Sequence, residues 1–254
     1  EPMYGSIVLE MVSDSPAGEL LGETTREYIF ESCGETLDMA ELQEIWESKL
    51  EPVYPYRKAG PTVEKINGKL NAPAAPKIGV AKPKVIIPVF PGTNCEYDTA
   101  KAFARAGADP EILVIRNLTP ADVTASCEAL VKAIGESQIV MLPGGFSGGD
   151  EPDGSAKFIA SFFRSPAVTE AVRRLLQQRD GLMLGICNGF QALIKLGLVP
   201  YGDIRPITAY DPTLTFNTIG RHQSMLVRTR VASTGSPWLS HCDAGSEYEI
   251  AISH

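Results

Sequence analysis

The sequence has no long hydrophobic run and no excess of positive charge. None of its apolar runs approaches the roughly 20 residues that a transmembrane helix needs. No charged and then apolar leader follows Glu1, so we expect no signal peptide. The formal net charge of -8 argues against a surface for nucleic acid or for anionic lipid. We therefore expect neither nucleic acid nor a membrane among the partners.

Cysteine and histidine are also scarce. The chain of 254 residues has 5 cysteines and 3 histidines. An odd number of cysteines at scattered spacings does not suggest a disulfide framework, and no C-x-x-C pair or histidine cluster suggests a metal site. We expect free thiols, no metal and a reducing cytoplasm.

Three regions differ in composition. Residues 1–57 suggest a small α+β segment, with a strand over 5–11 and a helix over 38–50 that Asp38 caps. One helix and one or two strands cannot make a core alone, so we expect this segment to pack on a larger body. Residues 58–83 are rich in proline, glycine and lysine without a period, as in a linker.

From residue 84 to residue 254 strand-like and helix-like segments alternate over short loops. Strands are expected over 85–90, 111–115, 139–142 and 182–186, and helices over 99–106, 122–134, 156–163, 167–179 and 190–196. Two more strand-like stretches cover 225–231 and 248–252. This alternation predicts an α/β domain with a doubly wound, mostly parallel sheet.

A cysteine stands where one of these strands turns into a helix. Cys187 follows the apolar run 181–186 and precedes the helical run 190–196, with Gly185 and Gly189 on either side. This is the pattern of a nucleophile elbow with cysteine in place of serine. Glycines permit the tight turn, and the helix N-terminus favours the thiolate. The alternative is a small buried apolar side chain, and the flanking glycines favour catalysis.

In such sheets, ligands bind at the loops that follow the carboxyl ends of the parallel strands. Here these loops are 91–95, 143–150 and the elbow. An acyl-transfer site needs two N–H donors for the developing oxyanion. The backbone N–H of Asn188, just after the nucleophile, and that of Gly145 are the candidates.

A cysteine nucleophile also needs a base. The three histidines are His222, His241 and His254. His254 follows a strand-like run, 250–253, and is a candidate because that run can bring it to a strand end that faces Cys187.

Several segments together resemble a known family. They are 90–95 with Asp98 and 102–103, 142–150, 184–191, 216–218 with Arg221, and 252–254. In type and order they resemble the triad (class I) glutamine amidotransferases, whose fold is flavodoxin-like. Among these they are most similar to the glutaminase end of the long, single-chain phosphoribosylformylglycinamidine synthases. Residues 1–57 resemble the tail of the synthetase half of those enzymes.

The resemblance implies a role for each candidate residue. Cys187 would attack the side-chain amide of glutamine, form a γ-glutamyl thioester and release ammonia, with His254 as general base and acid. Gly145 and Asn188 would form the oxyanion hole. Glutamine would be held by Gln191, Phe146 and Asn217.

The resemblance also implies the partners and cofactors. Glutamine is the substrate, and the remainder of the synthetase is the protein partner. This chain needs no cofactor of its own. The synthetase part uses ATP and Mg²⁺ to amidate formylglycinamide ribonucleotide in purine biosynthesis.

Two departures from the family pattern stand out. In the family a glutamate two positions after the histidine orients it, whereas this sequence ends at His254. We therefore expect a truncated domain that turns glutamine over poorly by itself. His222 and Gln223 stand where related enzymes often have an aromatic residue and an acid.

Two other functions fit parts of the pattern. An α/β-hydrolase-like enzyme with a cysteine nucleophile would need an acid at a strand end, for which Asp203 and Asp211 are candidates. A non-enzymatic flavodoxin-like domain would leave Cys187 unreactive.

Overall fold

A computed structural model of the chain describes residues 5–13, 18–52, 79–146, 155–214, 217 and 222–254. The chain divides into two compact units, Glu1–Val63 and Glu64–His254. Most of the expected linker, 58–78, lies outside the described residues. Within the described ranges, no helix is both long enough and apolar enough to cross a bilayer.

The described residues of the first unit form a β-hairpin and one helix. Strands β1 (Ile29–Ser32) and β2 (Glu35–Asp38) pair antiparallel, and α1 covers Met39–Ser48. The side chain of Asp38 accepts hydrogen bonds from the backbone N–H groups of Ala40 and Glu41, which confirms the predicted cap. The hairpin itself has no clear signal in the sequence.

The predicted strand over 5–11 is wrong. These residues have no regular structure and are exposed; Ile7, for example, is 82% exposed. A β-strand needs a neighbour to satisfy its backbone groups, and none of the described residues pairs with this segment.

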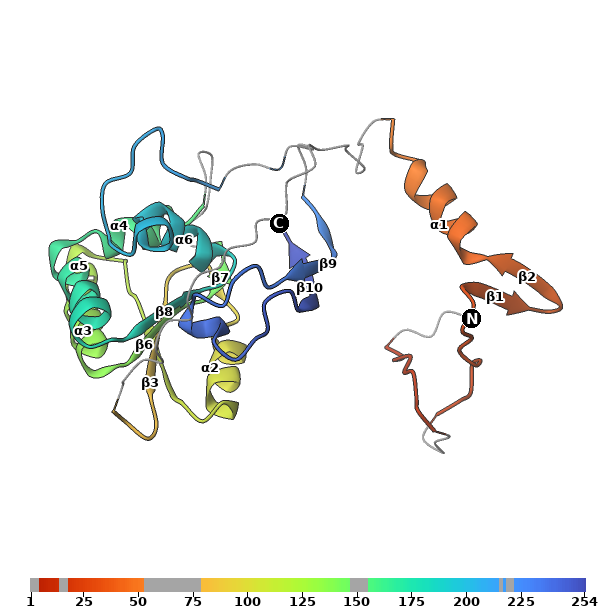
Figure 1. Ribbon diagram of the computed structural model, residues 1–254, viewed down its shortest axis with the longest axis horizontal. Helices are drawn as coiled ribbons and strands as arrows, with labels where there is room; N and C mark the ends of the chain where they lie inside the picture. The colour runs from red at the N-terminus through yellow and green to blue at the C-terminus, as the bar shows by residue number, and fades with distance from the viewer. Residues whose placement is uncertain (1–4, 14–17, 53–78, 147–154, 215–216, 218–221) are drawn as a thin grey trace. The chain divides into compact units, whose positions relative to one another are not determined.

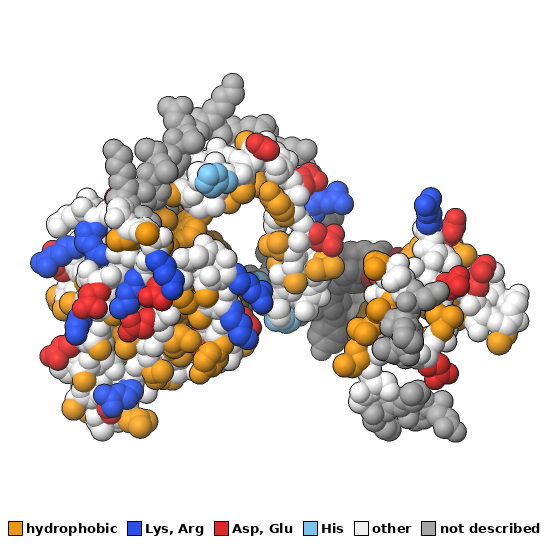
Figure 2. All heavy atoms as spheres, turned by 90° about the horizontal axis from the view of Figure 1, so that it is seen from below, with side chains coloured by type: hydrophobic (Ala, Val, Ile, Leu, Met, Phe, Trp, Pro, Cys, Tyr) orange, Lys and Arg blue, Asp and Glu red, His pale blue; other side chains and the backbone are white. Residues whose placement is uncertain are grey.

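None of the described residues in the first unit is buried. Its large apolar side chains are exposed instead, and Figure 2 shows them in orange among red acidic residues. They include Phe30 at 54%, Ile45 at 60% and Trp46 at 80% exposed. Over its described residues this unit thus has no core of its own, as the sequence predicts.

The second unit is built on a parallel sheet. Its strands are β3 (Lys84–Val89), β5 (Asp109–Val114), β6 (Ile139–Leu142) and β8 (Leu182–Gly185). They lie side by side in the order β5-β3-β6-β8, and every neighbouring pair is parallel. Counted along the chain this order is 2-1-3-4, as in flavodoxin-like sheets, so the predicted doubly wound α/β fold is confirmed.

Helices cover both faces of this sheet (Figure 1). One face packs against α3 (Pro120–Glu136), α4 (Lys157–Phe163), α5 (Pro166–Arg173) and α6 (Asn188–Leu196). The other face packs against α2 (Glu96–Arg105). Side chains alternate between the two cores: Ile86 and Leu142 point to the first, and Ile87 and Met141 to the second.

The helix signals in the sequence are mostly correct. Thr119 caps α3 in a capping box with Asp122, and Pro120 is the first residue of that helix. Gly197, in the left-handed conformation, ends α6 as predicted. The expected helix over 167–179 is interrupted: α5 ends at Arg173 and continues as a π-helical turn, Arg174–Gln178.

The remaining elements are short or lie at the C-terminus. A two-residue ladder joins β4 (Thr93–Asn94) to β7 (Gly144–Gly145), and α7 covers Leu198–Tyr201. Strands β9 (Ser224–Arg230) and β10 (Glu247–Ser253) pair antiparallel, and the connection between them contains the 3₁₀ turn η2 (Pro237–Leu239).

One side chain in η2 connects this C-terminal region to the sheet. The indole N–H of Trp238 donates to the backbone oxygen of Met183 on β8 at 3.0 Å. Its ring meets that of Phe103 on α2 edge-on, with centroids 6.4 Å apart. The hairpin that ends at His254 is thereby tied to the strand that leads to Cys187.

Candidate functional site

Cys187 occupies a strained turn between β8 and α6. Its φ is 54° and its ψ is -113°, a conformation that residues other than glycine rarely adopt. Hydrogen bonds hold the turn from both sides: Ile186 N donates to Leu142 O at 3.1 Å, and Gly189 N donates to Ile186 O at 2.9 Å. Cys187 is half-buried, so its sulfur lies at the edge of the core.

The flanking glycines are required because the helix rests directly on the strands. A Cβ at Gly185 would lie 2.6 Å from the backbone oxygen of Gly189. A Cβ at Gly189 would lie 2.0 Å from the backbone oxygen of Leu142. Backbone atoms cannot move aside as a flexible side chain can. The glycine pattern that predicts an elbow therefore has a steric cause in the fold.

The loop after β6 runs beside the Cys187 side chain. A Cβ placed on Gly144 would lie 3.2 Å from Cys187 Cβ and 3.7 Å from its Sγ. Gly144 is not among the site residues predicted from the sequence, although the Pro143-Gly144-Gly145 run contains the signal. The structure thus brings the second expected loop to the cysteine.

The pairing of β4 with β7 does not use the backbone N–H of Gly145. Phe146 N donates to Gly92 O at 2.8 Å, next to the opposed residues Thr93 and Gly145. Hydrogen-bonded and non-hydrogen-bonded pairs alternate in antiparallel ladders, so Thr93 and Gly145 form a non-hydrogen-bonded pair. The ladder therefore does not use the Gly145 N–H, which suits it to an oxyanion donor.

Two of the other predicted residues belong to the first turn of α6. Asn188 is 1% exposed, and its amide donates to the Gln191 side-chain oxygen at 3.3 Å. Gln191 N donates to Cys187 O at 3.0 Å. Phe146, which directly follows Gly145, is 70% exposed. The structure therefore gathers Cys187 and these candidates at one end of the sheet.

His254 has a fixed backbone. Its N–H donates to Gln223 O at 2.8 Å, and its carbonyl accepts from Gln223 N at 2.5 Å and from the Asn217 amide at 3.1 Å. The neighbouring Ser253 hydroxyl is 3.0 Å from His222 Nε2. Among the contacts of the described residues, none joins the His254 imidazole to Cys187.

The two acids of the hydrolase alternative are paired elsewhere. The Arg173 guanidinium donates two hydrogen bonds, of 2.8 and 3.1 Å, to the Asp203 carboxylate and lowers the pKa of that carboxyl. Asp211 accepts from the Tyr201 hydroxyl, from Thr208 N at 2.5 Å and from Arg205 at 3.2 Å. The Tyr201 hydrogen bond is the largest cause that lowers the pKa of Asp211 to about 2.

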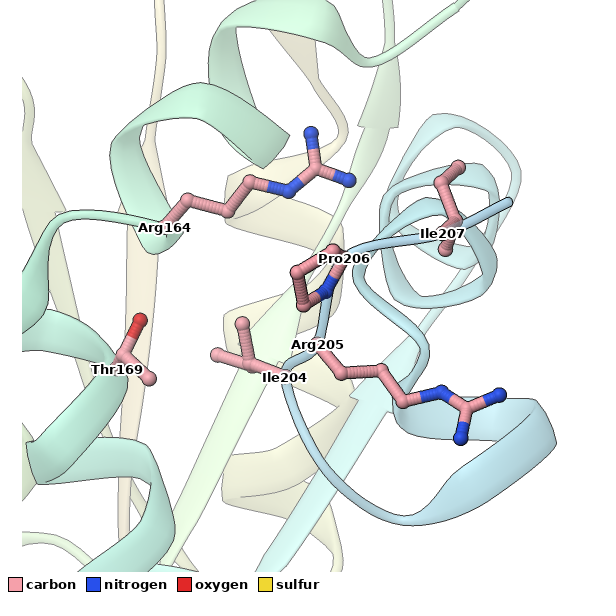
Figure 3. A pocket seen from close by; sticks show the side chains of 6 residues that line it. All are labelled: Arg164, Thr169, Ile204, Arg205, Pro206 and Ile207. Carbon is pink, nitrogen blue, oxygen red and sulfur yellow. The ribbon is translucent and has the colours of Figure 1, made fainter.

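A pocket of about 520 Å³ lies away from the cysteine. It is lined by Arg164, Thr169, Ile204, Arg205, Pro206 and Ile207. Arg164 also donates to the backbone oxygen of Lys195, near the C-terminal end of α6, which is roughly 12 Å along the helix from Cys187. In Figure 3 the two guanidinium groups point away from each other and do not converge on a common ligand. We do not assign the chemistry to this pocket.

The remaining features concern metals and thiols. Within the described parts of the chain, no three His, Cys, Asp or Glu side chains are grouped so that they could hold a metal ion. All five cysteines are unpaired.

Most of the second unit is similar in sequence to known proteins. Residues 82–254 match the family model described as a CobB/CobQ-like glutamine amidotransferase domain. The subunit PurQ of phosphoribosylformylglycinamidine synthase from Dehalococcoides mccartyi is 36% identical over 57% of this chain and 51% of its own length. The PurQ subunit from Symbiobacterium thermophilum is 36% identical over 65% of this chain and 58% of its own length. The chain thus spans only about half of these curated relatives.

One solved structure is also similar. The structure of PurLQS from Thermotoga maritima superposes with a TM-score of 0.49 at 24% identity, over 68% of this chain and 66% of that one. The fold assignment rests on the sheet order itself and does not depend on this likeness. The family match covers well over half of the 254 residues, from the first strand of the sheet to His254. The chain belongs to the CobB/CobQ-like glutamine amidotransferase domain family.

Proposed function

We propose that this chain is the glutaminase portion of a phosphoribosylformylglycinamidine synthase. One observation carries the proposal: Cys187 stands in an elbow conformation with the Gly144–Gly145 loop against its side chain. This arrangement pairs a nucleophile with donors for an oxyanion, which is the requirement of acyl transfer. The family match and the names of the curated relatives support glutamine as the acyl donor.

In the first half-reaction, the Cys187 thiolate attacks the side-chain carbonyl carbon of glutamine. A C–S bond forms, and the carbonyl π electrons move onto oxygen, where the N–H groups of Gly145 and Asn188 stabilise the charge. The His254 imidazolium then protonates the amide nitrogen. The C–N bond breaks, ammonia leaves, and a γ-glutamyl thioester remains.

In the second half-reaction, water attacks the thioester carbon and passes a proton to His254. The C–S bond breaks, and the electron pair returns to sulfur as the thiolate. Glutamine and water have become glutamate and ammonia. The imidazolium and the thiolate are restored together, so the site is ready for the next turnover.

His254 is the proposed base and acid because its backbone is fixed at the end of β10. Gln223 and Asn217 hold its backbone groups, and Trp238 ties the hairpin region to β8. Catalytic hydrogen bonds often shorten only when the substrate binds, and the proposal requires that the imidazole reach Cys187 in the glutamine complex. In this proposal Asn217 borders the glutamine site through its contact with His254.

Gln191 and Phe146 complete the proposed glutamine site. Gln191 lies one helical turn after Cys187 and is oriented by Asn188. Phe146 is exposed next to the oxyanion loop and offers an apolar wall. Together they would hold the side-chain amide in line with the sulfur.

The first unit is proposed to be the tail of the synthetase in a long, single-chain enzyme. Its hairpin and helix leave Phe30, Ile45 and Trp46 exposed, as expected for a fragment of a larger body. The synthetase would bind ATP and Mg²⁺ and use the ammonia to amidate formylglycinamide ribonucleotide. The five unpaired cysteines suit a reducing compartment, and we propose the cytoplasm.

No observation favours the α/β-hydrolase alternative. Its acid would have to orient a histidine, whereas Asp203 is gripped by Arg173 and Asp211 by Tyr201 and Arg205. A non-enzymatic domain would have no need of a strained cysteine beside a glycine loop.

An ammonium bypass tests the proposal. Cys187→Ser, assayed together with its synthetase part, should lose glutamine-dependent amidation of formylglycinamide ribonucleotide by a factor on the order of 10⁴ or more. Amidation with added ammonium salts should stay within about twofold of wild type, because it does not need the thioester. Cys127→Ser, which changes a half-buried thiol away from the elbow, is the matched control. Retained glutamine-dependent activity in Cys187→Ser would refute the proposal.

A further inference from the structure

The turn after β3 is closed by a threonine side chain. Phe90 N donates to Thr93 Oγ1 at 3.0 Å, and Thr93 N donates back to Phe90 O at 2.9 Å. Phe90 is 2% exposed, and its ring meets those of Phe158 and Phe162 edge-on with centroids 5.5 Å apart. The Thr93 hydroxyl therefore ties this turn to the aromatic core.

The same turn determines the path of the oxyanion loop. Thr93 opposes Gly145 in the β4–β7 ladder, and Phe146 N donates to Gly92 O at 2.8 Å. The two segments approach so closely that a Cβ at Gly145 would lie 2.3 Å from Gly92 O. A shift of the turn would therefore move the Gly145 N–H relative to the Cys187 sulfur.

We propose that Thr93 is a positioning residue for the Gly145 oxyanion donor. It acts through the turn and the ladder and does not touch the substrate. The inference rests on the proposed glutaminase function. It adds a residue that is not among the site residues predicted from the sequence. A donor must lie within a few tenths of an ångström of hydrogen-bonding distance from the oxyanion, so a small displacement of the loop is costly.

Thr93→Val is the critical variant because valine keeps the branched shape and removes only the hydroxyl. Loss of an oxyanion donor costs on the order of 10²–10³ in kcat, and a misplaced donor should cost part of that, about tenfold. The KM for glutamine should stay within about twofold, since the ground state does not use the oxyanion hole. Thr93→Ser retains the acceptor for Phe90 N and should restore kcat to within about twofold of wild type.

A matched control separates this effect from a general loss of stability. Thr169 is half-buried, and its hydroxyl donates to Phe163 O at 2.8 Å in a turn away from Cys187. Thr169→Val removes a comparable hydrogen bond and should leave kcat within about twofold. Equal losses of kcat in Thr93→Val and Thr169→Val would overturn the proposal.

Two thiol probes give a second readout that a purely structural role would not produce. An aldehyde analogue of glutamine forms a hemithioacetal whose oxygen would occupy the oxyanion hole, so Thr93→Val should bind it about tenfold more weakly. Alkylation of Cys187 by iodoacetamide needs no oxyanion and should proceed at the wild-type rate. Unchanged aldehyde affinity in Thr93→Val would refute the positioning role.

The proposed function and the positioning role of Thr93 can be refuted separately. If wild type, assayed together with its synthetase part, neither binds the aldehyde analogue nor hydrolyses glutamine, the proposed function is wrong. If wild type does both and Thr93→Val matches it, the function stands and only the role of Thr93 is wrong.

Discussion

Cys187 and Cys95 share more than their residue type. Cys187 is the N-cap of α6, and Cys95 is the N-cap of α2. Each lies in the connection between a strand of the parallel sheet and the helix that it caps. Each also has a positive φ, 54° for Cys187 and 68° for Cys95. The two differ in ψ, which is -113° at Cys187 and 17° at Cys95.

The surroundings of the two cysteines differ more than their backbones. Gly189, two residues after Cys187, packs on the backbone of Leu142, whereas Tyr97, two residues after Cys95, is 68% exposed. The start of α6 is therefore pressed onto the sheet, while that of α2 is open to solvent. A helix N-terminus is common to both sites, and at Cys187 the loop of Gly144 also lies against the side chain. We infer that this packing, and not the helix dipole, makes the nucleophile.

The largest effect is expected from a substitution that disrupts the packing of α6 on the sheet. Gly189→Ala would place a Cβ 2.0 Å from Leu142 O, so the helix and strand must separate. Such overpacking should cost about 2–3 kcal/mol in the free energy of unfolding. Urea denaturation measures the loss, and glutamine turnover should fall with it because the elbow shifts.

Gly135→Ala is the matched control for this variant. Gly135 lies in α3, and nothing comes within 4 Å of a Cβ built there. Alanine is the better helix former, so this change should stabilise the fold by about 0.5–1 kcal/mol. Similar effects of the two substitutions would show that α6 is not pressed onto the sheet.

Local signals in the sequence predict the elbow and the sheet well because their causes are local. Gly185 and Gly189 stand where a Cβ would meet backbone, and the strand 139–142 is apolar because both of its faces are covered. The β4–β7 ladder is only two residues long on each strand and depends on loops 50 residues apart, so no periodicity reveals it. The exposed segment 5–11 shows the converse error, since strand-like residues without a partner strand remain irregular.

A smaller effect is expected from a substitution at Asp211, whose contacts involve neither cysteine. Tyr201, Thr208 and Arg205 lower the pKa of Asp211 from 3.8 to about 2. A lowered pKa means that the carboxylate stabilises the fold fully above pH 3.8, and that this contribution is lost as the pH falls through about 2. Asp211→Asn should therefore unfold at a lower temperature than wild type at pH 7, and the difference should shrink between pH 3.8 and pH 2.

This variant sharpens the comparison because it weakens contacts of the fold that involve neither cysteine. The alkylation rates of Cys187 and Cys95 at pH 7 should match those of wild type. A change at Cys187 alone would show that its reactivity follows overall stability and not the local packing.

Labelling with a diazo-ketone analogue of glutamine tests the central claim most directly. The reagent needs a nucleophilic sulfur and a site that recognises glutamine, so mass mapping should find the label on Cys187 before Cys33, Cys95, Cys127 or Cys242, and excess glutamine should slow it. Iodoacetamide, which needs no recognition, should label the exposed Cys95 as well. Diazo-ketone label that appears first on Cys95, or that glutamine does not slow, would contradict the assignment of Cys187 as the glutaminase nucleophile.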